Sequence, residues 1–263
     1  MDFFSDLAGK RVVVTGACGI IGRWIADAFR ASGADLCLTD VDKSSLESVA
    51  SELELSEASF TKVADLTDEA SIDSLVDAIG RRWGSADVLV NNAGIYPSGF
   101  LLDIGSEEFD RIFAINLRAP FLISKGIARQ MIAHERKGSI INISSGASRK
   151  MRRTVVPYCT SKTALDRLTK GFAIELAEFG IRVNALEPGF AAGSTVSSLT
   201  DEHVANTIAN IPLGRPSSPQ DVANGLLYLA SDASSYVTGA TITIDGGNSI
   251  GSLAVHQAKK SPL

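Results

Sequence analysis

The sequence contains few of the residues that build disulfide frameworks and metal sites. Its 263 residues include three cysteines and three histidines. Cys18, Cys37 and Cys159 are odd in number and far apart, which predicts neither a disulfide framework nor a zinc site and is typical of a reducing cytoplasm. The histidines also lack the spacing of metal ligands, so we expect no bound metal.

Long apolar runs and an excess of positive charge are missing as well. No apolar run approaches the ~20 residues that a membrane span needs, and the first ten residues, MDFFSDLAGK, lack the apolar core of a signal peptide. The formal net charge of −5 disfavours broad contact with nucleic acid phosphates. With 45% hydrophobic residues the chain is expected to fold. We therefore expect a cytoplasmic protein that binds neither membranes nor nucleic acids.

Short apolar runs alternate along the chain with longer segments of helical periodicity. The runs are almost continuously apolar, which is typical of strands that are covered on both faces in a parallel sheet. Strands are expected at Arg11–Thr15, Asp35–Thr39, Ser59–Val63, Asp87–Asn91, Ser139–Ser144, Ile181–Leu186 and Ala240–Ile244. Helices are expected at Ile21–Ala31, Ser44–Leu53, Ala70–Trp83, Ser106–Arg136 and Tyr158–Phe179. The alternation predicts an α/β fold in which a single domain, residues 1–263, contains a doubly wound seven-stranded parallel sheet.

The first expected strand leads directly into a glycine-rich turn, TGACGIIG at residues 15–22, which precedes a helix. Gly16, Gly19 and Gly22 recur every three residues, and glycine lets backbone amides approach a ligand closely. The helix that follows offers free N–H groups to a pyrophosphate. The turn therefore indicates dinucleotide binding, although a tight turn that packs a helix onto the sheet would need the same residues.

Asp40 follows the second expected strand, eighteen residues after Gly22. A carboxylate at this place can accept both ribose hydroxyls of an adenosine, and it would repel a 2′-phosphate. Lys43 is the one basic residue nearby. The pattern favours NAD over NADP, while a helix N-cap or a turn remains the alternative explanation for Asp40.

Tyr158 and Lys162 are four residues apart at the start of an expected helix, which places both on one helical face. A nearby ammonium lowers the pKa of a phenol from about 10 toward the range of an acid–base catalyst. Ser145 follows a strand thirteen residues earlier, at the sheet edge where doubly wound folds bind ligands. Asn116 is a polar residue within an apolar helical stretch, which predicts a buried hydrogen bond. The four residues are candidates for catalysis, although an ordinary surface helix would also explain the tyrosine–lysine spacing.

Taken together, these motifs resemble those of the short-chain dehydrogenase/reductase family, in its single-domain branch. The resemblance covers nearly the whole chain and rests on the turn at 15–22, Asp40, Asp65-Leu66, Asn91-Asn92-Ala93-Gly94, Asn116, Ser145, Tyr158 with Lys162, Pro188-Gly189 and Asp245-Gly246-Gly247. It implies a Rossmann-like fold and hydride transfer between a nicotinamide cofactor and a secondary alcohol or ketone.

The resemblance also implies a role for each site residue. Tyr158 would exchange a proton with the substrate oxygen, Ser145 would hydrogen-bond that oxygen, and Lys162 would hold the nicotinamide ribose and lower the pKa of the tyrosine. Asn116 would anchor a water that relays protons from Lys162. The cofactor would contact Gly16, Gly19, Ile21, Gly22, Asp40, Asp65, Leu66, Asn92, Ala93, Gly94, Tyr158, Lys162, Pro188 and Gly189.

Two positions depart from the family pattern. The middle glycine of the turn is one place early, at Gly19, and Ile20 occupies its usual position. This spacing is similar to that of the longer, sugar-nucleotide branch of the family. Five residues after Pro188, Gly193 stands where the family often has a threonine, and Ser194 is a candidate replacement.

The segment Arg149–Arg153 places four cations within five residues. It predicts either an anionic substrate, because arginine binds carboxylates and phosphates bidentately, or a solvated loop or intersubunit patch. Candidate pocket walls are Ile95, Tyr96, Met151 and Phe190.

Residues 190–212 are expected to form a substrate lid with hinges at Gly189 and Gly193, and residues 250–263 a partly frayed tail. Family members pair the two long helices across two-fold axes, so the resemblance implies a homotetramer.

The leading prediction is an NAD-dependent alcohol dehydrogenase or ketone reductase. Two alternatives stay open: an epimerase or dehydratase that retains NAD, which the glycine spacing suggests, and a nucleotide-sensing protein without turnover. The second would not need the set of Asn116, Ser145, Tyr158 and Lys162.

Overall fold

The computed structural model describes residues 5–192, 200–251 and 253, and within these ranges it has an α/β architecture. The strands are β1 (Arg11–Thr15), β2 (Asp35–Asp40), β3 (Phe60–Val63), β4 (Val88–Asn91), β5 (Ser139–Ile143), β6 (Arg182–Pro188) and β7 (Thr241–Ile244). All pair in parallel in the order β3-β2-β1-β4-β5-β6-β7. The predicted doubly wound seven-stranded sheet is confirmed, and each strand lies within two residues of its predicted bounds.

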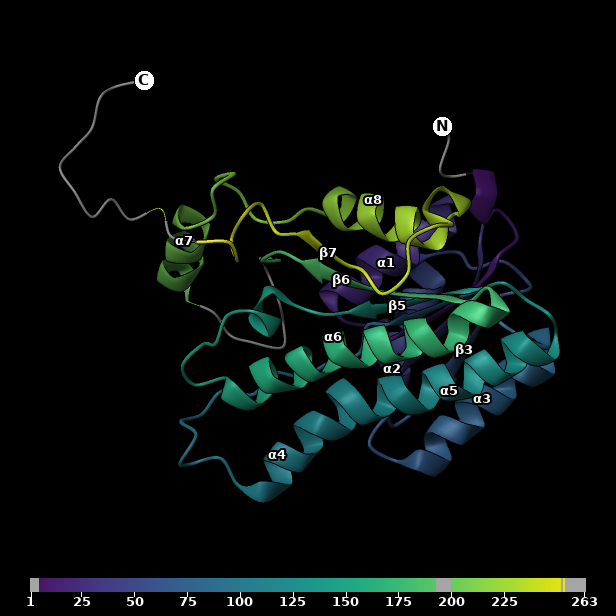
Figure 1. Ribbon diagram of the computed structural model, residues 1–263, viewed down its shortest axis with the longest axis horizontal. Coiled ribbons are helices and arrows are strands. Elements are labelled where there is room, and N and C mark those ends of the chain that lie inside the picture. Colours follow the sequence, from purple (N-terminus) through teal and green to yellow (C-terminus); the bar gives the residue numbers. More distant parts are fainter. Residues whose placement is uncertain (1–4, 193–199, 252, 254–263) are drawn as a thin grey trace.

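Helices cover both faces of this sheet. They are α1 (Ile20–Ala31), α2 (Lys43–Glu52), α3 (Glu69–Trp83), α4 (Ser106–Phe113), α5 (Ala119–Ala133), α6 (Val156–Leu176), α7 (Asp201–Ala209) and α8 (Pro219–Ala230). Figure 1 shows α1 and α8 on one side of the sheet and α3, α5 and α6 on the other. Five short turns complete the described elements: η1 (Ser5–Leu7), η2 (Ala114–Arg118), η3 (Gly146–Ser148), η4 (Ala177–Phe179) and η5 (Asp232–Ser234).

The alternation of side chains along each strand divides the core into two layers. Val12 and Val14 of β1 pack with α1 and α8, whereas Val13 between them packs with α3 and α5. Because both layers are apolar, every central strand is apolar on both faces, which explains its continuous run of valine, isoleucine and leucine.

The helices differ from the predictions in three places, of which one is α7, within the segment expected as a lid. The segment expected as one helix from Ser106 is divided by the π-helical turn η2, and its last helix, α5, ends at Ala133. The helix α8 was not predicted, although a capping box marks its start: Ser218 and Asp221 exchange hydrogen bonds between side chain and backbone. Its apolar residues fill the core beside α1.

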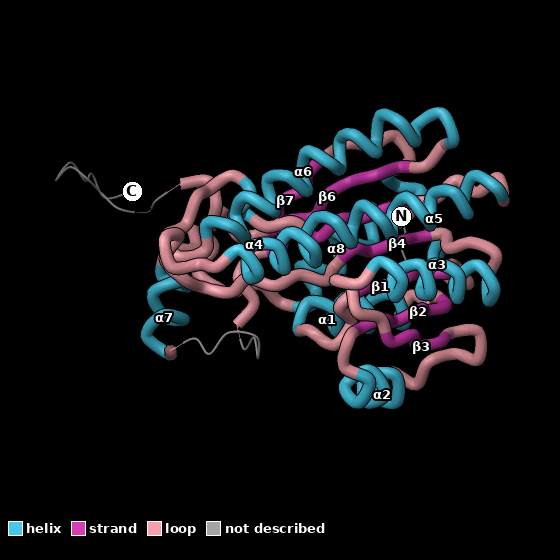
Figure 2. Tube along the Cα trace, turned by 90° about the horizontal axis from the view of Figure 1, so that it is seen from below, coloured by secondary structure: helices cyan, strands magenta, loops and turns pink. Residues whose placement is uncertain are grey.

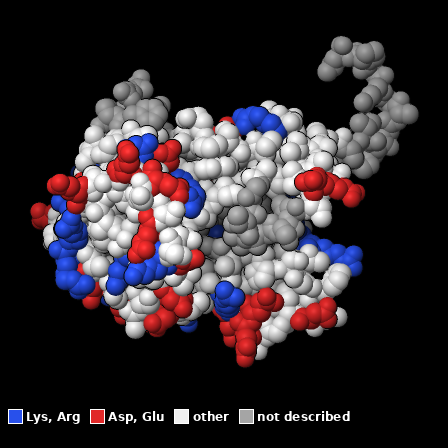
Figure 3. Space-filling model, turned by 180° about the vertical axis from the view of Figure 1, so that it is seen from behind, with Lys and Arg blue, Asp and Glu red and all other residues white. Residues whose placement is uncertain are grey.

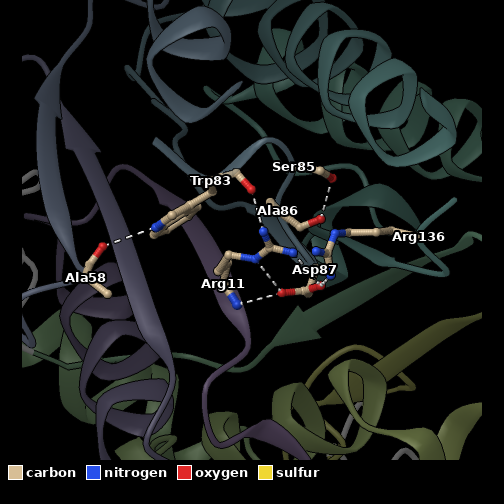
Figure 4. Close-up of polar contacts among 7 residues, drawn as sticks. All are labelled: Arg11, Ala58, Trp83, Ser85, Ala86, Asp87 and Arg136. Atoms are coloured by element: carbon tan, nitrogen blue, oxygen red, sulfur yellow. Dashed lines mark hydrogen bonds and ion pairs between the residues drawn. The ribbon is translucent and has the colours of Figure 1, made fainter. Parts of the chain in front are cut away.

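An ion cluster lies at the amino-terminal edge of the sheet, where Arg11 begins β1 and Asp87 precedes β4 (Figure 4). Asp87 accepts hydrogen bonds from the backbone and guanidinium of Arg11, and Arg136 reaches the same carboxylate at 3.0 Å. Arg11 also donates to the carbonyl of Trp83. Burial opposes ionisation, but the hydrogen bonds from Arg11 and the charges of both arginines outweigh it and lower the pKa of Asp87. The cluster ties β1 to the loop that leads into β4.

The surface carries charges of both signs. On the face shown in Figure 3, Lys and Arg side chains lie among Asp and Glu side chains, with uncharged areas between them. No helix in the described ranges is long and apolar enough to cross a membrane. Among the same residues, no three His, Cys, Asp or Glu side chains are grouped as metal ligands would be.

Candidate active site

The cleft at the carboxyl edge of the sheet has a volume of about 1120 Å³ and follows the ends of six strands, β1 to β6. The order of the strands reverses between β1 and β4, because successive strands extend outward from β1 in one half and from β4 in the other. Such a switch point leaves a crevice outside the strand ends, where ligands bind. In Figure 2 the helix α7 lies beyond this edge, and its residues His203 and Thr207 line the cleft.

All but one of the predicted site residues line this cleft. They are Gly16, Gly19, Ile21, Gly22, Asp40, Asp65, Leu66, Asn92, Ala93, Gly94, Ser145, Tyr158, Lys162, Pro188 and Gly189. Asn116 is the exception, because its side chain is fully buried behind the cleft wall.

The glycine-rich turn forms a close-packed cradle at the end of β1. Gly16 has a φ of +64°, and a Cβ there would lie 2.7 Å from Cα of Ala93. At Gly22 a Cβ would collide with the carbonyl of Gly16, so a helix residue with a side chain could not pack there. A Cβ at Gly19 would meet no atom closer than 3.7 Å. The early position of this glycine therefore leaves the cradle intact.

The amino terminus of α1 is open toward the cleft. Its N-cap, Gly19, offers no side chain to the first N–H groups, whereas Asp42 caps α2 and Asp68 caps α3. Uncapped N–H groups at the positive end of a helix fit a pyrophosphate. The turn and helix thus provide what a dinucleotide needs at its phosphates.

Asp40 lies at the far end of the cleft, where β2 ends. Its Oδ2 accepts a hydrogen bond of 2.9 Å from the backbone N–H of Cys18, and its Oδ1 accepts one from Val41. The carboxylate is thereby fixed beside the glycine-rich turn. Burial and the Asp40 carboxylate raise the pKa of the Cys18 thiol to about 12, so this cysteine is an inert wall of the site.

Asn92 and Asp65 shape the middle of the cleft. Asn92 donates to the carbonyls of Thr15 and Gly16, both at 2.9 Å, and so joins the loop after β4 to the turn after β1. The carboxylate of Asp65 accepts from the hydroxyl and backbone N–H of Thr67, and these bonds lower the pKa of Asp65. Both predicted cofactor residues therefore hold the loops that form the cradle.

Tyr158, the predicted acid–base residue, lies where α6 begins. Burial raises the pKa of its phenol, and a hydrogen bond with Ser145 and the charge of Arg152 lower it by less. The expected lowering of this pKa by Lys162 stays a prediction, because the two groups that lower it here are Ser145 and Arg152. The ammonium donates to the carbonyl of Ile143 at 2.8 Å and lies 5.9 Å from the centre of the tyrosine ring. Helical spacing places the side chains of Tyr158 and Lys162 on one face of α6, and the ammonium of Lys162 forms its hydrogen bond with a carbonyl of β5.

Lys162 is itself removed from solvent, with 4% of its surface exposed. Burial lowers the pKa of its ammonium to about 8, and Asp166 opposes that change. A Cβ added to Gly94 would lie 3.4 Å from both Nζ of Lys162 and Oδ1 of Asn116, so this glycine leaves room over the lysine.

Asn116 lies in the π-helical turn η2, and its buried amide is fully engaged. Its Oδ1 accepts from the N–H of Ile95, and its Nδ2 donates to the carbonyl of Ile95 and to Oγ of Ser161. π-Helical turns often occur at functional sites. Here the turn connects α4 and α5 to the cleft wall and to α6, so the amide positions the loop after β4. A water-anchoring role for Asn116 stays a prediction.

The cations of the segment Arg149–Arg153 make different contacts. Arg149 donates to the fully buried carboxylate of Glu187 at 2.6 Å, and also to Thr243 and Ser249. Arg153 stacks over the ring of Phe100. Arg152 alone of the run lines the cleft.

The lid region is described in part. Phe190 and Ala191 line the cleft together with α7. The predicted hinge at Gly193 and the candidate contact Ser194 lie outside the described residues, as does most of the predicted tail. Gly189 packs closely, since a Cβ there would lie 2.7 Å from Cα of Asp245.

Comparisons with known proteins agree with this geometry. The family model described as enoyl-(acyl carrier protein) reductase matches residues 16–249. Galactitol 2-dehydrogenase from Agrobacterium fabrum is 35% identical over 92% of this chain and 98% of its own length. A short-chain type dehydrogenase/reductase from Mycobacterium marinum is 35% identical, with a TM-score of 0.87 over 95% of this chain and 99% of its own. A gluconate 5-dehydrogenase from Burkholderia cenocepacia, in complex with NADP and tartrate, is 29% identical, with a TM-score of 0.86 over 94% and 99% of the two chains.

The match extends over nearly the whole chain, and the cleft contains the cofactor cradle and the tyrosine, lysine and serine that the sequence predicts. The chain therefore belongs to the short-chain dehydrogenase/reductase family and is an NAD(P)-dependent oxidoreductase that interconverts a secondary alcohol and a ketone.

Proposed function

We propose that the protein oxidises a secondary alcohol or reduces the corresponding ketone with NAD, and that Tyr158 is its acid–base catalyst. One observation carries the proposal: Tyr158 and Ser145 line the same cleft as the glycine-rich turn and Asp40. When bound, the nicotinamide accepts or supplies the hydride.

Residues of the chain transfer the proton and bind the substrate oxygen. Because burial raises the pKa of Tyr158, the phenol keeps its proton at neutral pH and is ready to give it to a carbonyl oxygen. Ser145 holds that oxygen by a hydrogen bond. The ammonium of Lys162, fixed by Ile143, places positive charge beside the phenolate that forms.

Replacing Tyr158 by phenylalanine tests the assignment. We expect the Tyr158→Phe variant to lose about 10²- to 10⁴-fold in kcat, with the Kd of NAD unchanged within about twofold. Tyr236→Phe is the matched control, since Tyr236 is fully exposed. Undiminished turnover in Tyr158→Phe would exclude the proposed role. Wild-type protein that binds NAD without any net formation of NADH on alcohols would favour the epimerase, dehydratase or sensor alternatives.

The preference for NAD over NADP rests on Asp40. Its carboxylate is held in the cleft by Cys18 and Val41, where it would face a 2′-phosphate. Like charges in contact cost several kcal/mol, so we expect kcat/KM to favour NAD by at least about tenfold. Asp40→Asn keeps the shape and removes the charge, and should reduce that ratio. An equal or higher kcat/KM with NADP in the wild-type protein would reverse the proposal, and the NADP-bound gluconate 5-dehydrogenase makes this comparison essential.

For the substrate we propose a small polyhydroxylated molecule that carries a carboxylate, bound by Arg152. This arginine lines the cleft with Tyr158, and its charge lowers the pKa of the tyrosine. Arg149, in contrast, forms an ion pair with Glu187. The named relatives act on galactitol and gluconate, one neutral and one acidic. Arg152→Gln should raise KM for gluconate by about tenfold and leave KM for galactitol unchanged; Arg153→Gln, on the same loop, is the control. Equal effects on both substrates would exclude an anion site.

We further propose that residues 190–212 close over this substrate.

We also propose that the protein is a homotetramer and that it is located in the cytoplasm. Large apolar side chains on α4, α5 and α6 face outward: Phe109, Phe121 and Ile174 are 41%, 40% and 80% exposed. Such faces suit pairing across two-fold axes. Light scattering should return four times the chain mass of 27.7 kDa, and a monomer would contradict the proposal. The cytoplasmic location rests on three cysteines that form no disulfide.

A further inference from the structure

A buried carboxylate outside the set of candidate catalytic residues lies at the end of β6. The side chain of Glu187 has no exposed surface, and its strand neighbours Ala185 and Leu186 are apolar and fully buried. Because side chains alternate along a strand, Glu187 lies on the same face of the sheet as Val183, the face that α6 covers. Carboxylates are almost never fully buried unless they are paired. The partners of Glu187 therefore indicate what it holds in place.

Two partners of Glu187 come from one short turn, η3. Oε1 accepts a hydrogen bond of 2.8 Å from the hydroxyl of Ser148, the last residue of the turn. Oε2 forms an ion pair at 2.6 Å with the guanidinium of Arg149, the C-cap of the turn. The hydroxyl of Thr243 on β7 also donates to Oε2. The carboxylate thus joins the sheet to the carboxyl end of η3 by a hydrogen bond and an ion pair.

The amino end of the same turn is Ser145, the residue proposed to hold the substrate oxygen. Its Oγ caps η3 by accepting from the backbone N–H of Ala147 at 3.2 Å, and its carbonyl accepts from the N–H of Ser148 at 2.8 Å. Because Oγ accepts from Ala147, the hydroxyl keeps its own proton for a substrate oxygen. The direction in which Ser145 presents that proton therefore depends on the conformation of η3.

The turn is short and needs support from other elements. A 3₁₀ turn has poorer hydrogen-bond geometry than an α-helix, and here the N–H of Arg149 reaches the carbonyl of Gly146 at 3.3 Å. From outside the turn, Thr163 of α6 donates to the carbonyl of Ser148 at 2.6 Å. Hydrogen bonds to a charged group are about twice as strong as those between neutral groups. The carboxylate of Glu187 therefore provides the strongest of these supports.

We propose that Glu187 is a positioning residue that acts through Ser145: it holds η3 by Ser148 and Arg149, and η3 in turn fixes the serine hydroxyl against the substrate oxygen. The inference rests on the proposed role of Ser145. It differs from a purely structural role, in which the carboxylate would only fasten the end of β6 to Thr243 of β7. In that case its loss would lower stability and leave catalysis by the folded protein unchanged.

The first test compares two changes at this anchor. Glu187→Gln keeps the shape and removes the charge, and Ser148→Ala removes one of the two links to η3. Ser139→Ala is the matched control, because the hydroxyl of Ser139 donates to the carbonyl of Leu229 at 2.9 Å and does not line the cleft. We expect kcat to fall about 30-fold in Glu187→Gln and about fivefold in Ser148→Ala, since small displacements of a reacting group are costly, and less than about twofold in the control.

The binding of the cofactor separates this effect from a general disturbance of the cleft. Gly189, two residues beyond Glu187, has its own backbone hydrogen bond of 2.8 Å to the carbonyl of Ile244. We therefore expect the Kd of NAD to change by less than about threefold in Glu187→Gln while kcat falls, because only the turn that carries the serine is released.

A cycle of double variants decides whether Glu187 acts through Ser145. Ser145→Ala removes the hydroxyl, so a contact that serves only this hydroxyl has little further to affect. Glu187→Gln should lower the residual kcat of Ser145→Ala by less than about threefold, against about 30-fold in the wild type. An equal loss in both backgrounds would overturn the inference, because the effect of Glu187 would then not pass through the serine.

A further measurement needs neither cofactor nor turnover. Hydrogen exchange reports how often a segment opens, and the N–H groups of Ala147 and Ser148 are bonded to Ser145. Their exchange should become about tenfold faster in Glu187→Gln and in Ser148→Ala and stay unchanged in Ser139→Ala. If the carboxylate held only β6 and β7 together, exchange in η3 would not change.

The outcomes separate this inference from the proposed function. A wild-type protein without NAD-dependent turnover would refute the proposed function, and hydrogen exchange would still decide whether Glu187 holds η3. Unchanged exchange of Ala147 and Ser148 in both anchor variants would overturn the inference, and so would faster exchange with an unchanged kcat. If Glu187→Gln does not fold, Ser148→Ala takes its place in the binding measurement and in the cycle with Ser145→Ala.

Discussion

Replacing Asn116 with alanine removes the three hydrogen bonds that fix the π-helical turn to the loop after β4 and to α6. The change leaves the N–H and carbonyl of Ile95 and the hydroxyl of Ser161 without this partner in a fully buried place. A buried polar group left unsatisfied costs about 1–3 kcal/mol, and a neighbouring loop can relax to recover some of it. We expect Asn116→Ala to lower the free energy of unfolding by about 3–5 kcal/mol.

Asn184 provides a matched control in the same chain. It is also fully buried, and its amide likewise bridges a backbone N–H and a carbonyl, those of Ala240 and Val237, at 3.0 and 2.9 Å. It does not line the active-site cleft. Asn184→Ala should therefore cost a similar free energy, about 2–4 kcal/mol, with kcat unchanged in the folded fraction.

Urea unfolding at a fixed protein concentration measures the first effect, and kcat at saturating cofactor measures the second. Asn116→Ala should lose about 10²-fold in kcat, because the loop that it holds contains Gly94, beside Lys162. A stability loss below about 0.5 kcal/mol would show that the amide does not hold the turn. Equal kcat losses in the two variants would show that the effect on catalysis is not specific to this position.

Two further predictions concern the cradle and the opposite edge of the sheet. Gly16→Ala should abolish NAD binding measured by calorimetry, since its φ of +64° and the 2.7 Å approach of a Cβ to Ala93 both exclude a side chain. Because the pKa of Asp87 is lowered by Arg11 and Arg136, its contribution to stability is present above the unfolded value of about 3.9 and is lost as the pH falls through the lower folded value. Asp87→Asn should therefore destabilise the protein at pH 7 and flatten the acid limb of its unfolding curve; an unchanged acid limb would refute the assignment.

The sequence determined the sheet and the cofactor cradle because both depend on local chemistry. Strands covered on both faces must be continuously apolar, so the run of valines in β1 marked its bounds. Gly16 is required locally by its positive φ, and Gly22 by its contact with Gly16 in the same turn, whereas the contact of Gly16 with Ala93 exists only in the folded protein. The spacing of Tyr158 and Lys162 likewise follows from a single helix. The helix α8 was within reach of such reasoning, since its capping box is a local signal.

Only the tertiary structure decided which partner each polar group takes. The sequence could not show that Lys162 donates a hydrogen bond to the carbonyl of Ile143, or that Asn116 lies in a π-helical turn. It also could not show that Arg149 forms an ion pair with Glu187 while Arg152 lines the cleft. These contacts join residues from different strands and helices, and the burial that sets their pKa values exists only once the sheet has brought those elements together.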